Sequence, residues 1–378
     1  NHGSLRTNGL CSLTATGMGW IALALASEEP YRLLSPCEAI LRIRIGLETA
    51  LHALPHDGGV LPHFVDSQTG RVHGDDYLST IETAWMAAGA LWAAAFLRDA
   101  ALERLAEALT ERIDWYSWTA PDESKIPLLR HGQTRDGRFL PWTWDRLNGE
   151  TVFLYVLAAG AAEERAVPVS AWSHLRSFHG TAAGLHFNNS DLGLFVFQYG
   201  MDLLDLGDWL APNGLDLAVE SGVAAEANYR VCRELAGSFT TFRDYWGLSA
   251  GDGPAAPPAD LAYRCYAPGG PIDGTAHLTA SLASIGQRPD LVAENLDRAA
   301  HERRWPLLGR YGFSNVNADH NWVGPDMVGI DAGAAVLALD NNLSGNRVRN
   351  VFHTLACVQR GLERSGFCAR AAQLVRAA

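Results

Sequence analysis

The stretch Ser79–Arg98, STIETAWMAAGALWAAAFLR, indicates the fold because it is apolar on nearly every side. A helix at a protein surface keeps a polar face, so a helix without one is predicted to be buried all round. The next segment, Ala100 to Tyr116, carries charged residues at helical spacing and is predicted to be an outer helix. This part of the chain therefore predicts an inner helix followed by an outer one.

The same alternation recurs along the chain, with long polar loops between the helices. The other predicted helices are 11–27, 37–54, 149–162, 191–206, 216–236, 275–284, 289–304, 331–341 and 345–360, followed by a terminal helix. The apolar–polar alternation of β-strands is nearly absent. The pattern predicts one all-α domain over residues 1–378, a ring of inner helices within an outer ring, with loops forming a cleft on one face. A two-domain helical solenoid is the alternative.

Composition excludes several classes of function. The formal net charge is −12, whereas nucleic acids and acidic membranes bind basic surfaces. No apolar run is long enough to span a bilayer, so membrane insertion is not expected. The chain contains no G-x-G-x-x-G or H-E-x-x-H pattern, and no cofactor or metal is predicted. Oligomeric state and cellular localisation stay open.

The cysteines are scattered singly, without C-x-x-C pairs or the Cys/His spacing of a zinc site. They are predicted to be buried thiols, although a disulfide remains possible.

The segment Arg310–Gly345 is the densest of four polar loops that each lead into an inner helix. It contains Asp319, His320 and Trp322, and Asp331 stands where the apolar helix begins. An aromatic ring beside carboxylates and amides suits a sugar, whose apolar face stacks on the ring while its hydroxyls bind the polar groups. A surface loop rich in turn formers is the other interpretation.

Two more loops resemble it, in the N-terminal half. One runs from His63 to Glu82, and the other, FLPWTWDRLNGE, contains Trp144 and Asp145 and ends at Glu150. A carboxylate in the first turn of a helix is favoured by the helix dipole, so Glu82 and Glu150 could each be capping residues. Asn148 is the expected N-cap of the helix that Glu150 opens.

The fourth loop, from Asp244 to Leu278, contains acids and aromatic residues among glycines: Trp246, Asp252, Tyr263 and Asp273. Core packing and turn formation explain any one of these loops equally well. Four together favour a carbohydrate cleft, where glycosidic cleavage needs one protonated and one ionised carboxyl.

The runs YWGLSAGDGP, PIDGTAHLTASLASI and GRYGFSNVNADHNWVGPDMVGIDAGAAVLALDNNLSG resemble the bacterial glycoamylase-like family. That family includes endo-β-1,2-glucanases of glycoside hydrolase family 144 and the cyclising domain of cyclic β-1,2-glucan synthases. LPHFVDSQTG and FNNSDLGLFVFQYGMDLLD are also similar, so the resemblance covers nearly the whole chain.

The resemblance implies an (α/α)6 barrel and metal-independent, inverting hydrolysis. It places Glu150 at the position of the general acid, and Asp252, Asp273 and Asp331 at acids of the family's loops. His63 and Trp322 match residues that line the family's cleft. The chain departs from the family pattern at Glu82, where an aspartate is usual, and at 340–345, where a Tyr and an Arg are missing.

These observations predict a glycoside hydrolase acting on a β-glucan or related oligosaccharide, with β-1,2-glucan as the first substrate. Glu150 would be the general acid, and Asp331, Asp319 or Glu82 the base, about 6.5–9.5 Å apart in an inverting enzyme. The alternatives are a transglycosylase or cyclase on the same glycans, and a non-hydrolytic carbohydrate-binding or repurposed protein, since a fold does not determine a function.

Overall fold

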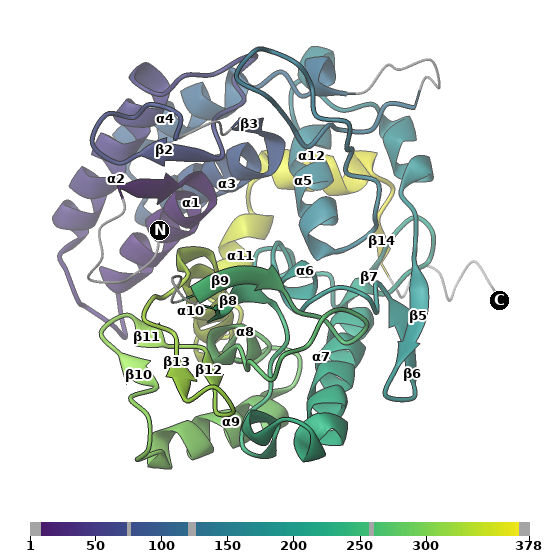
Figure 1. The fold of residues 1–378 in the computed structure, drawn as a ribbon. Coiled ribbons are helices and arrows are strands. Elements are labelled where there is room, and N and C mark those ends of the chain that lie inside the picture. The colour runs from purple at the N-terminus through teal and green to yellow at the C-terminus, as the bar shows by residue number, and fades with distance from the viewer. Residues whose placement is uncertain (1–8, 74–76, 120–125, 257–260, 370–378) are drawn as a thin grey trace.

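The computed structural model describes residues 9–73, 77–119, 126–256 and 261–369. It is helix-rich (Figure 1), and its α-helices are α1 (Leu13–Ala26), α2 (Pro36–His52), α3 (Thr80–Leu97), α4 (Ala100–Glu111), α5 (Gly149–Ala159), α6 (Phe195–Gln198), α7 (Leu217–Glu234), α8 (Leu278–Leu282), α9 (Pro289–His301), α10 (Gly329–Leu343), α11 (Arg347–His353) and α12 (Ala356–Arg364). Short 3-10 helices are η1 (Tyr116–Trp118), η2 (Glu163–Arg165), η3 (Val169–His174), η4 (Leu235–Gly237) and η5 (Thr240–Arg243).

The strands form small antiparallel ribbons of two strands each. The ribbons are β1 (Leu10–Ser12) with β2 (Phe64–Asp66), β3 (Leu78–Ser79) with β4 (Gly132–Gln133), β5 (His179–Ala182) with β6 (Leu185–Asn188), β7 (Trp209–Leu210) with β14 (Cys368–Ala369), β8 (Ala250–Pro254) with β9 (Leu261–Cys265), β10 (Leu308–Gly309) with β11 (Gly312–Phe313), and β12 (Val316–Asn317) with β13 (Trp322–Val323). Strands this short carry too little alternation to be visible in a sequence.

Helix α3 lies in the core, as its composition predicts. It packs against α1, α4 and α5, and its two tryptophans, Trp85 and Trp92, are fully buried. Among the described helices it has the length and hydropathy of a membrane span, but 78% of it is buried inside the molecule. Its apolar surface is therefore covered by protein.

Each inner helix contacts an outer one. Helix α2 packs on α1, α4 on α3, α12 on α5, α7 on α6, α9 on α8 and α11 on α10. Figure 1 shows α2 at the left edge and α9 at the lower edge of the molecule, outside the helices that they contact. The predicted alternation of buried and amphipathic helices is thus present in the structure.

Local signals mark the starts of several helices, and one of them, Asn148, is the predicted N-cap. Ser12 accepts a hydrogen bond from the backbone of Ala15, Pro36 opens α2, and Asn148 accepts one from Thr151. Each cap satisfies a backbone N–H that has no partner within the helix.

Other boundaries are wrong. The predicted helix 191–206 shortens to α6, because Gly200 adopts a left-handed φ of +81° directly after Tyr199, where the helix has ended. The helix predicted over 275–284 is α8 only, and 345–360 splits into α11 and the start of α12. The predicted terminal helix extends into 370–378, outside the described residues.

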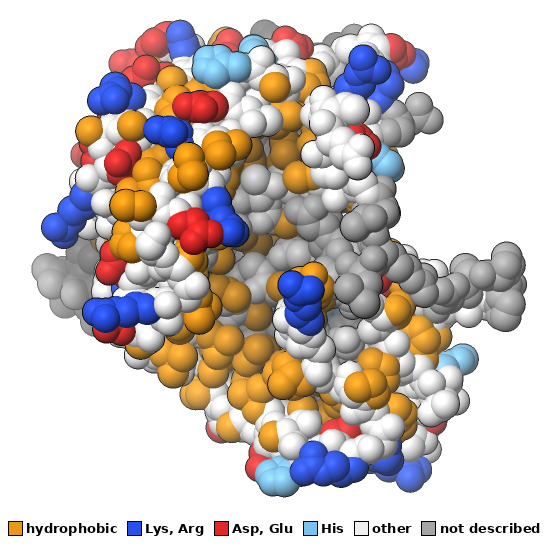
Figure 2. Space-filling model, turned by 90° about the vertical axis from the view of Figure 1, so that its left-hand side faces the viewer, with side chains coloured by type: hydrophobic (Ala, Val, Ile, Leu, Met, Phe, Trp, Pro, Cys, Tyr) orange, Lys and Arg blue, Asp and Glu red, His pale blue; other side chains and the backbone are white. Residues whose placement is uncertain are grey.

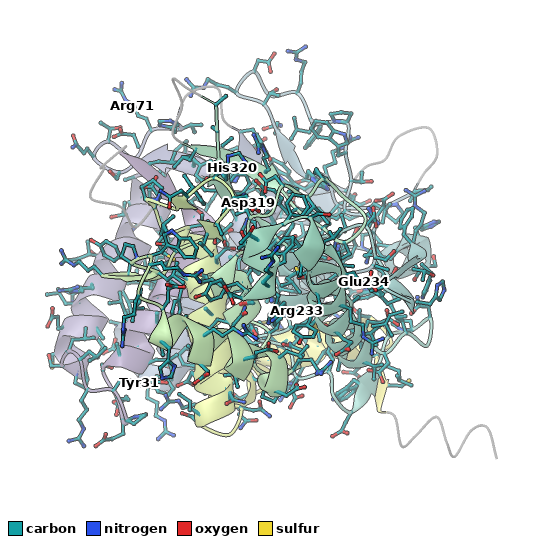
Figure 3. All side chains as sticks on the ribbon, turned by 60° about the horizontal axis from the view of Figure 1, so that its bottom comes forward. Tyr31, Arg71, Arg233, Glu234, Asp319 and His320 are labelled. Carbon is teal, nitrogen blue, oxygen red and sulfur yellow. The ribbon has the colours of Figure 1, made fainter. Side chains whose placement is uncertain are left out.

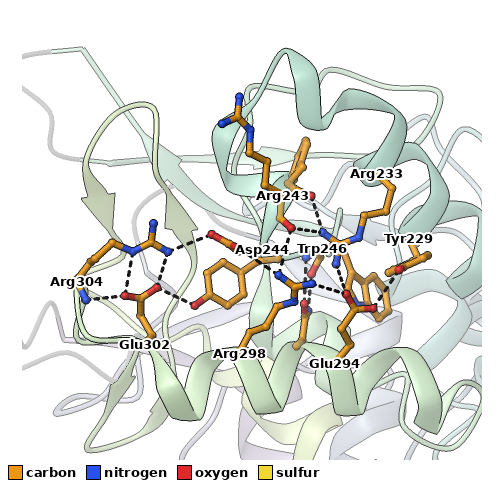
Figure 4. Close-up of polar contacts among 12 residues, drawn as sticks. Tyr229, Arg233, Arg243, Asp244, Trp246, Glu294, Arg298, Glu302 and Arg304 are labelled. Atoms are coloured by element: carbon orange, nitrogen blue, oxygen red, sulfur yellow. Dashed lines mark hydrogen bonds and ion pairs between the residues drawn. The ribbon is translucent and has the colours of Figure 1, made fainter.

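On the outside of the molecule, α7, α9 and the loops beside them are joined by ion pairs (Figure 4). Arg233 and Arg298 both donate to Glu294, and Arg298 and Arg304 both contact Asp244. Single surface pairs contribute about 0–1 kcal/mol, but a shared network orients its members more strongly.

The surface carries mixed charge. On the face that Figure 2 shows, hydrophobic side chains lie between arginine and acidic ones. This mixture differs from the one-sign basic surface that binds nucleic acid.

The cysteines are free thiols, and Cys37 and Cys265 are exposed, contrary to the prediction that all would be buried.

Candidate active site

A cavity of about 510 Å³ lies where the N-terminal ends of inner helices meet two β-ribbons. Its lining comes from β1, β2, α1, α3, α5, α6, β8, β9 and the start of α10. The residues that line it are Leu10, Ser12, Thr14, His63, Phe64, Glu82, Glu150, Phe195, Tyr199, Ala250, Asp252, Leu261, Tyr263, Val328, Gly329 and Ile330. Segments far apart in the sequence therefore build one site.

First-turn residues of separate helices supply much of its chemistry. Thr14 comes from the first turn of α1, Glu82 from that of α3 and Glu150 from that of α5. Asp331, in the first turn of α10, directly follows three lining residues and accepts a hydrogen bond from a fourth, Tyr199. The partial positive charge of a helix N-terminus favours a carboxylate by about 0.3–1 kcal/mol, and by up to about 2 when partly buried.

Glu150 is kept protonated near neutral pH. Burial disfavours its charged form, and the neighbouring Glu82 carboxylate repels it, so its pKa rises from 4.5 to about 8. A carboxyl that holds its proton at pH 7 can act as a general acid.

Asp331 is a buried carboxyl, only 5% exposed. Burial raises its pKa to about 7, a hydrogen bond from the Tyr199 hydroxyl lowers it, and Asp252 raises it. The Tyr199 oxygen lies 2.8 Å from Oδ1 of Asp331. Near neutral pH this carboxyl exchanges its proton readily, as a general base must.

Glu82 and His63 form a pair across the cavity wall. Nε2 of His63 lies 3.3 Å from Oε1 of Glu82, and the Thr14 hydroxyl donates to the same oxygen at 3.4 Å. The other oxygen, Oε2, is buried and has no hydrogen-bond partner among the described residues. That oxygen can therefore accept a hydrogen bond from a ligand.

Asp252 and Tyr263 are cross-strand partners in the β8–β9 ribbon. Asp252 is 2% exposed, whereas Tyr263 is 51% exposed and reaches the cavity opening. Burial, and then the charges of Asp331 and Asp252, raise the pKa of Tyr263, so its phenol stays neutral and can donate a hydrogen bond.

The structure brings together six of the residues selected from sequence: five line the cavity and Asp331 adjoins it. The five are His63, Glu82, Glu150, Asp252 and Tyr263.

Trp144 and Asp145 do not line this cavity. Trp144 stacks on His131 with ring centroids 4.0 Å apart and donates its indole N–H to Thr80, and Asp145 is paired with Arg176. These contacts hold the loop before α5 in place.

Trp246 and Asp273 also lie outside the lining. Trp246 is fully buried and donates its indole N–H to the carbonyl of Leu291, which is a core contact and not a sugar platform. Asp273 accepts hydrogen bonds from Arg264 and Tyr266 and so stabilises the end of the β8–β9 ribbon.

The hairpin from β12 to β13 carries Asp319, His320 and Trp322, none of which lines the cavity. Asp319 and His320 are exposed and lie side by side (Figure 3). Asp319 accepts a hydrogen bond from the backbone N–H of Thr240, at 2.9 Å. The polar density of this segment thus serves the hairpin and its contacts more than the cavity.

Sequence reasoning did not select Tyr199, Thr14 or the apolar lining residues. Tyr199 lies in FVFQYG, where a Tyr that ends an apolar run beside Gly200 is a weak signal of a buried polar contact. Thr14 shares the first-turn position that singled out Glu82 and Glu150. A search for polar side chains in the first turn of every apolar helix would have selected Thr14 as well.

Among the residues that the structure describes, no group of three or more His, Cys, Asp or Glu side chains is placed to hold a metal ion.

The sequence model of the family described as "Putative glucoamylase" matches residues 141–356 of the chain. That range includes Glu150, Tyr199, Asp252 and Asp331. A search of curated proteins gave no match.

Solved structures share the fold at low sequence identity. A putative glucoamylase from Bacteroides uniformis has a TM-score of 0.83 at 19% identity, over 97% of this chain and 90% of its own. An endo-β-1,2-glucanase from Chitinophaga pinensis, in complex with sophorotriose and glucose, has a TM-score of 0.79 at 19% identity, over 96% of this chain and 88% of its own. An endo-β-1,2-glucanase from Talaromyces funiculosus, in complex with sophorose, has a TM-score of 0.64 at 12% identity, over 94% of this chain and 81% of its own.

Proposed function

Because this chain belongs to the "Putative glucoamylase" family, we propose that it is a glycoside hydrolase that cleaves a β-glucan or a related oligosaccharide. The observation that carries the proposal is the pair of carboxyls at the cavity, Glu150 and Asp331, whose pKa values are raised to about 8 and about 7. Glycosidic cleavage needs one carboxyl that gives a proton and one that takes a proton.

In the proposed reaction Glu150 donates its proton to the leaving glycosidic oxygen as the bond to the anomeric carbon breaks. Asp331 accepts a proton from the water whose oxygen attacks that carbon. The products are two free hydroxyl groups, and the configuration at the anomeric carbon inverts because water attacks the opposite face. The Tyr199 hydroxyl positions Asp331, and no cofactor enters the reaction.

Glu82 remains a second candidate for the base, since it lines the cavity and has a buried oxygen without a partner among the described residues. Its first role is electrostatic, because its charge raises the pKa of Glu150. Asp319 is a weaker candidate, because it is exposed and outside the lining.

We propose β-1,2-glucan as the first substrate to test. The supporting facts are the fold shared with the Chitinophaga pinensis and Talaromyces funiculosus endo-β-1,2-glucanases and the cavity at the helix N-termini.

The proposed architecture is a single (α/α)6 barrel. Contacts link α10 to α1, α1 to α3, α3 to α5, α5 to α6 and α8 to α10. Gln198 of α6 joins the remaining neighbours, since its side-chain N–H group donates to the carbonyl of Ala280 in α8 at 2.7 Å. These contacts support a closed inner ring, with the active site at the N-terminal ends of its helices.

The test is hydrolysis of linear β-1,2-glucan, laminarin and cellulose by the wild type and by Glu150→Gln. Loss of the general acid is expected to lower the rate by about 10²–10⁴-fold. Glu107→Gln, on the exposed face of α4, is the matched control and should keep full activity.

An unchanged rate in Glu150→Gln would overturn the assignment of the acid. Transfer products in place of new reducing ends would indicate a transglycosylase. Sugar binding without turnover would indicate a binding protein on the same fold.

A further inference from the structure

A second cavity, of about 370 Å³, lies at the opposite end of α5 from Glu150. It is bounded by the ends of α4 and α5, by η2 and by α12, which packs on α5 (Figure 1). At 1.5 Å per residue, Gly160 on its wall is about 15 Å along the helix from Glu150. None of its described lining residues lines the candidate active site, so this cavity is a separate place on the molecule.

Three guanidinium groups line this cavity, those of Arg165 in η2 and of Arg360 and Arg364 in α12. Residues four apart share one face of a helix, so Arg360 and Arg364 lie on the same side of α12. Two glycines let α12 approach α5 closely. A Cβ added at Gly160 would lie 1.9 Å from a carbonyl oxygen of α12, and one at Gly361 would lie 1.9 Å from a carbonyl oxygen of α5. This approach places both arginines at the end of α5.

Hydrogen bonds to the backbone hold the three side chains in place. Arg360 donates through Nε and Nη2, and Arg364 donates through Nη1, to carbonyls at the end of α5 over 2.8–3.2 Å. Arg165 donates through Nη1 to the last carbonyl of α4. A guanidinium group has more N–H donors than these bonds use. Helix capping therefore orients each arginine and leaves it N–H groups for a ligand.

The positive charges of the three arginines are not matched by direct partners. None of them forms an ion pair with a carboxylate in the part of the chain that the structure describes. Like charges at the spacing of Arg360 and Arg364 destabilise a helix. Glu111 and Glu164 also line the cavity, but both are exposed and neither is paired with these arginines. An anion bound among the guanidinium groups would relieve their repulsion.

The inner wall of the cavity is apolar. Ile113 and Leu157 line it and are 1% and 4% exposed, whereas Arg165 and Arg360 are exposed. The charged groups therefore lie towards solvent and the apolar ones towards the core. The volume is within the range of about 300–1,000 Å³ that is usual for sites of small molecules.

We infer that this cavity binds a small organic anion. Its carboxylate or phosphate group lies among Arg165, Arg360 and Arg364, and its apolar part lies against Ile113 and Leu157. Carboxylate and phosphate are the groups that the planar guanidinium binds through paired hydrogen bonds. The site is separate from the proposed reaction, so the inference does not depend on the proposed function.

The experiment measures dissociation constants of benzoate and phenyl phosphate by isothermal titration calorimetry at low ionic strength, with benzyl alcohol as the uncharged analogue. We expect an anion to bind at least about tenfold more tightly than benzyl alcohol, because hydrogen bonds to charged groups are the stronger ones. The anion with the lower dissociation constant identifies the group, carboxylate or phosphate, that the site prefers. Equal affinities for the anions and the alcohol would overturn the inference.

Arg360→Gln tests where the anion binds. It removes one positive charge from the cavity and should weaken binding of the preferred anion by at least about tenfold. Arg104→Gln is the matched control, because Arg104 is exposed on α4 and outside the lining, and it should leave the dissociation constant unchanged. The same loss of affinity in both variants would overturn the inference.

Glu164→Gln tests the same site through a gain in affinity, which a folding defect does not produce. It removes a negative charge at the exposed side of the cavity and should tighten binding by about 2–5-fold at low ionic strength. The gain should diminish as salt is added. An affinity that stays unchanged or falls in this variant would overturn the placement of the anion in this cavity.

Discussion

Glu150 and Asp331 occupy similar positions, in the first turns of two helices that are far apart in the sequence. Both lose hydration, but they differ in their neighbours. Glu82 repels the charge on Glu150, while the Tyr199 hydroxyl stabilises the charge on Asp331. In the proposed reaction this difference suits Glu150 to the role of the acid and Asp331 to that of the base.

The first prediction concerns the pH dependence of kcat/KM. The base must be ionised, so activity should rise as pH passes the Asp331 pKa of about 7. The acid must be protonated, so activity should fall as pH passes the Glu150 pKa of about 8. A narrow bell with its maximum between these values is expected in steady-state assays on the substrate that the protein cleaves.

Tyr199→Phe serves as the control for this profile. The variant loses the hydrogen bond that lowers the Asp331 pKa, so the acidic limb should move to higher pH while the basic limb stays in place. Profiles that coincide for the two proteins would contradict the assignment of the base.

The second prediction concerns Asp202, a buried carboxyl outside the cavity lining. Both of its oxygens lack a hydrogen-bond partner among the described residues, and burial raises its pKa from 3.8 to about 8. Between these values the folded state binds a proton that the unfolded state has lost. Stability from this group is therefore fully present at low pH and falls, by up to about 1.4 kcal/mol per pH unit, as pH rises towards the folded pKa.

Asp202→Asn removes this titration while keeping the shape of the protonated side chain. Relative to wild type, the variant should gain stability steadily between pH 5 and pH 7.5, measured by urea unfolding at several pH values. A stability difference that does not change with pH would show that Asp202 is ionised in the folded protein.

At the scale of elements, the packing of α1 on α3 aligns the helix ends at the cavity. The contact depends on glycine: a Cβ added at Gly17 would lie 2.2 Å from the carbonyl oxygen of Trp85. Gly89 faces the same contact, since a Cβ there would lie 2.2 Å from the carbonyl oxygen of Gly17. Because Thr14 and Glu82 come from these two helices, their separation depends on this close approach.

The third prediction compares two glycines of α1. Gly17→Ala should destabilise the protein by about 1–3 kcal/mol, because the added methyl group forces the helices apart. Gly19→Ala, two residues away with nothing within 4 Å, should stabilise it by about 0.5–1 kcal/mol through the lower entropy of the unfolded chain. Equal effects in urea unfolding would show that α1 and α3 do not approach each other as described.

At the scale of the whole molecule, one buried side chain, Gln198, links α6 to α8 and the turn that follows it. Gln198, 2% exposed, donates to the carbonyl of Ala280 at 2.7 Å and to the hydroxyl of Ser284 at 2.8 Å. Helix α6 is a single turn followed by Tyr199, so these bonds also hold the residue that positions Asp331.

The fourth prediction is that Gln198→Leu destabilises the protein by about 1–3 kcal/mol, because it leaves a buried carbonyl without a partner. Gln359→Leu removes an exposed hydrogen bond to the carbonyl of His353 and should change stability by less than about 0.5 kcal/mol. Thermal and urea unfolding of the pair measure the difference. If Gln198→Leu behaves like its control, the link between α6 and α8 has little importance for the ring.

The sequence was sufficient for the elements with strong local patterns. The all-apolar Ser79–Arg98 stretch becomes the buried α3, and Asn148 caps α5 as predicted. It was insufficient for 191–206, where the left-handed Gly200 leaves only the single turn of α6. Apolar composition alone does not distinguish a buried helix from a buried turn.

For the site, the sequence by itself determined which carboxyls begin inner helices, because helical period and capping depend on neighbouring residues. Only the tertiary structure decided that Glu82, Glu150, Asp252 and Asp331 meet while Trp246 and Asp319 lie elsewhere. Whether two residues meet depends on how helices distant in the chain pack and on which ribbon covers their ends. Burial and the proximity of other charges, which raise the pKa values of Glu150 and Asp331, arise from that packing alone.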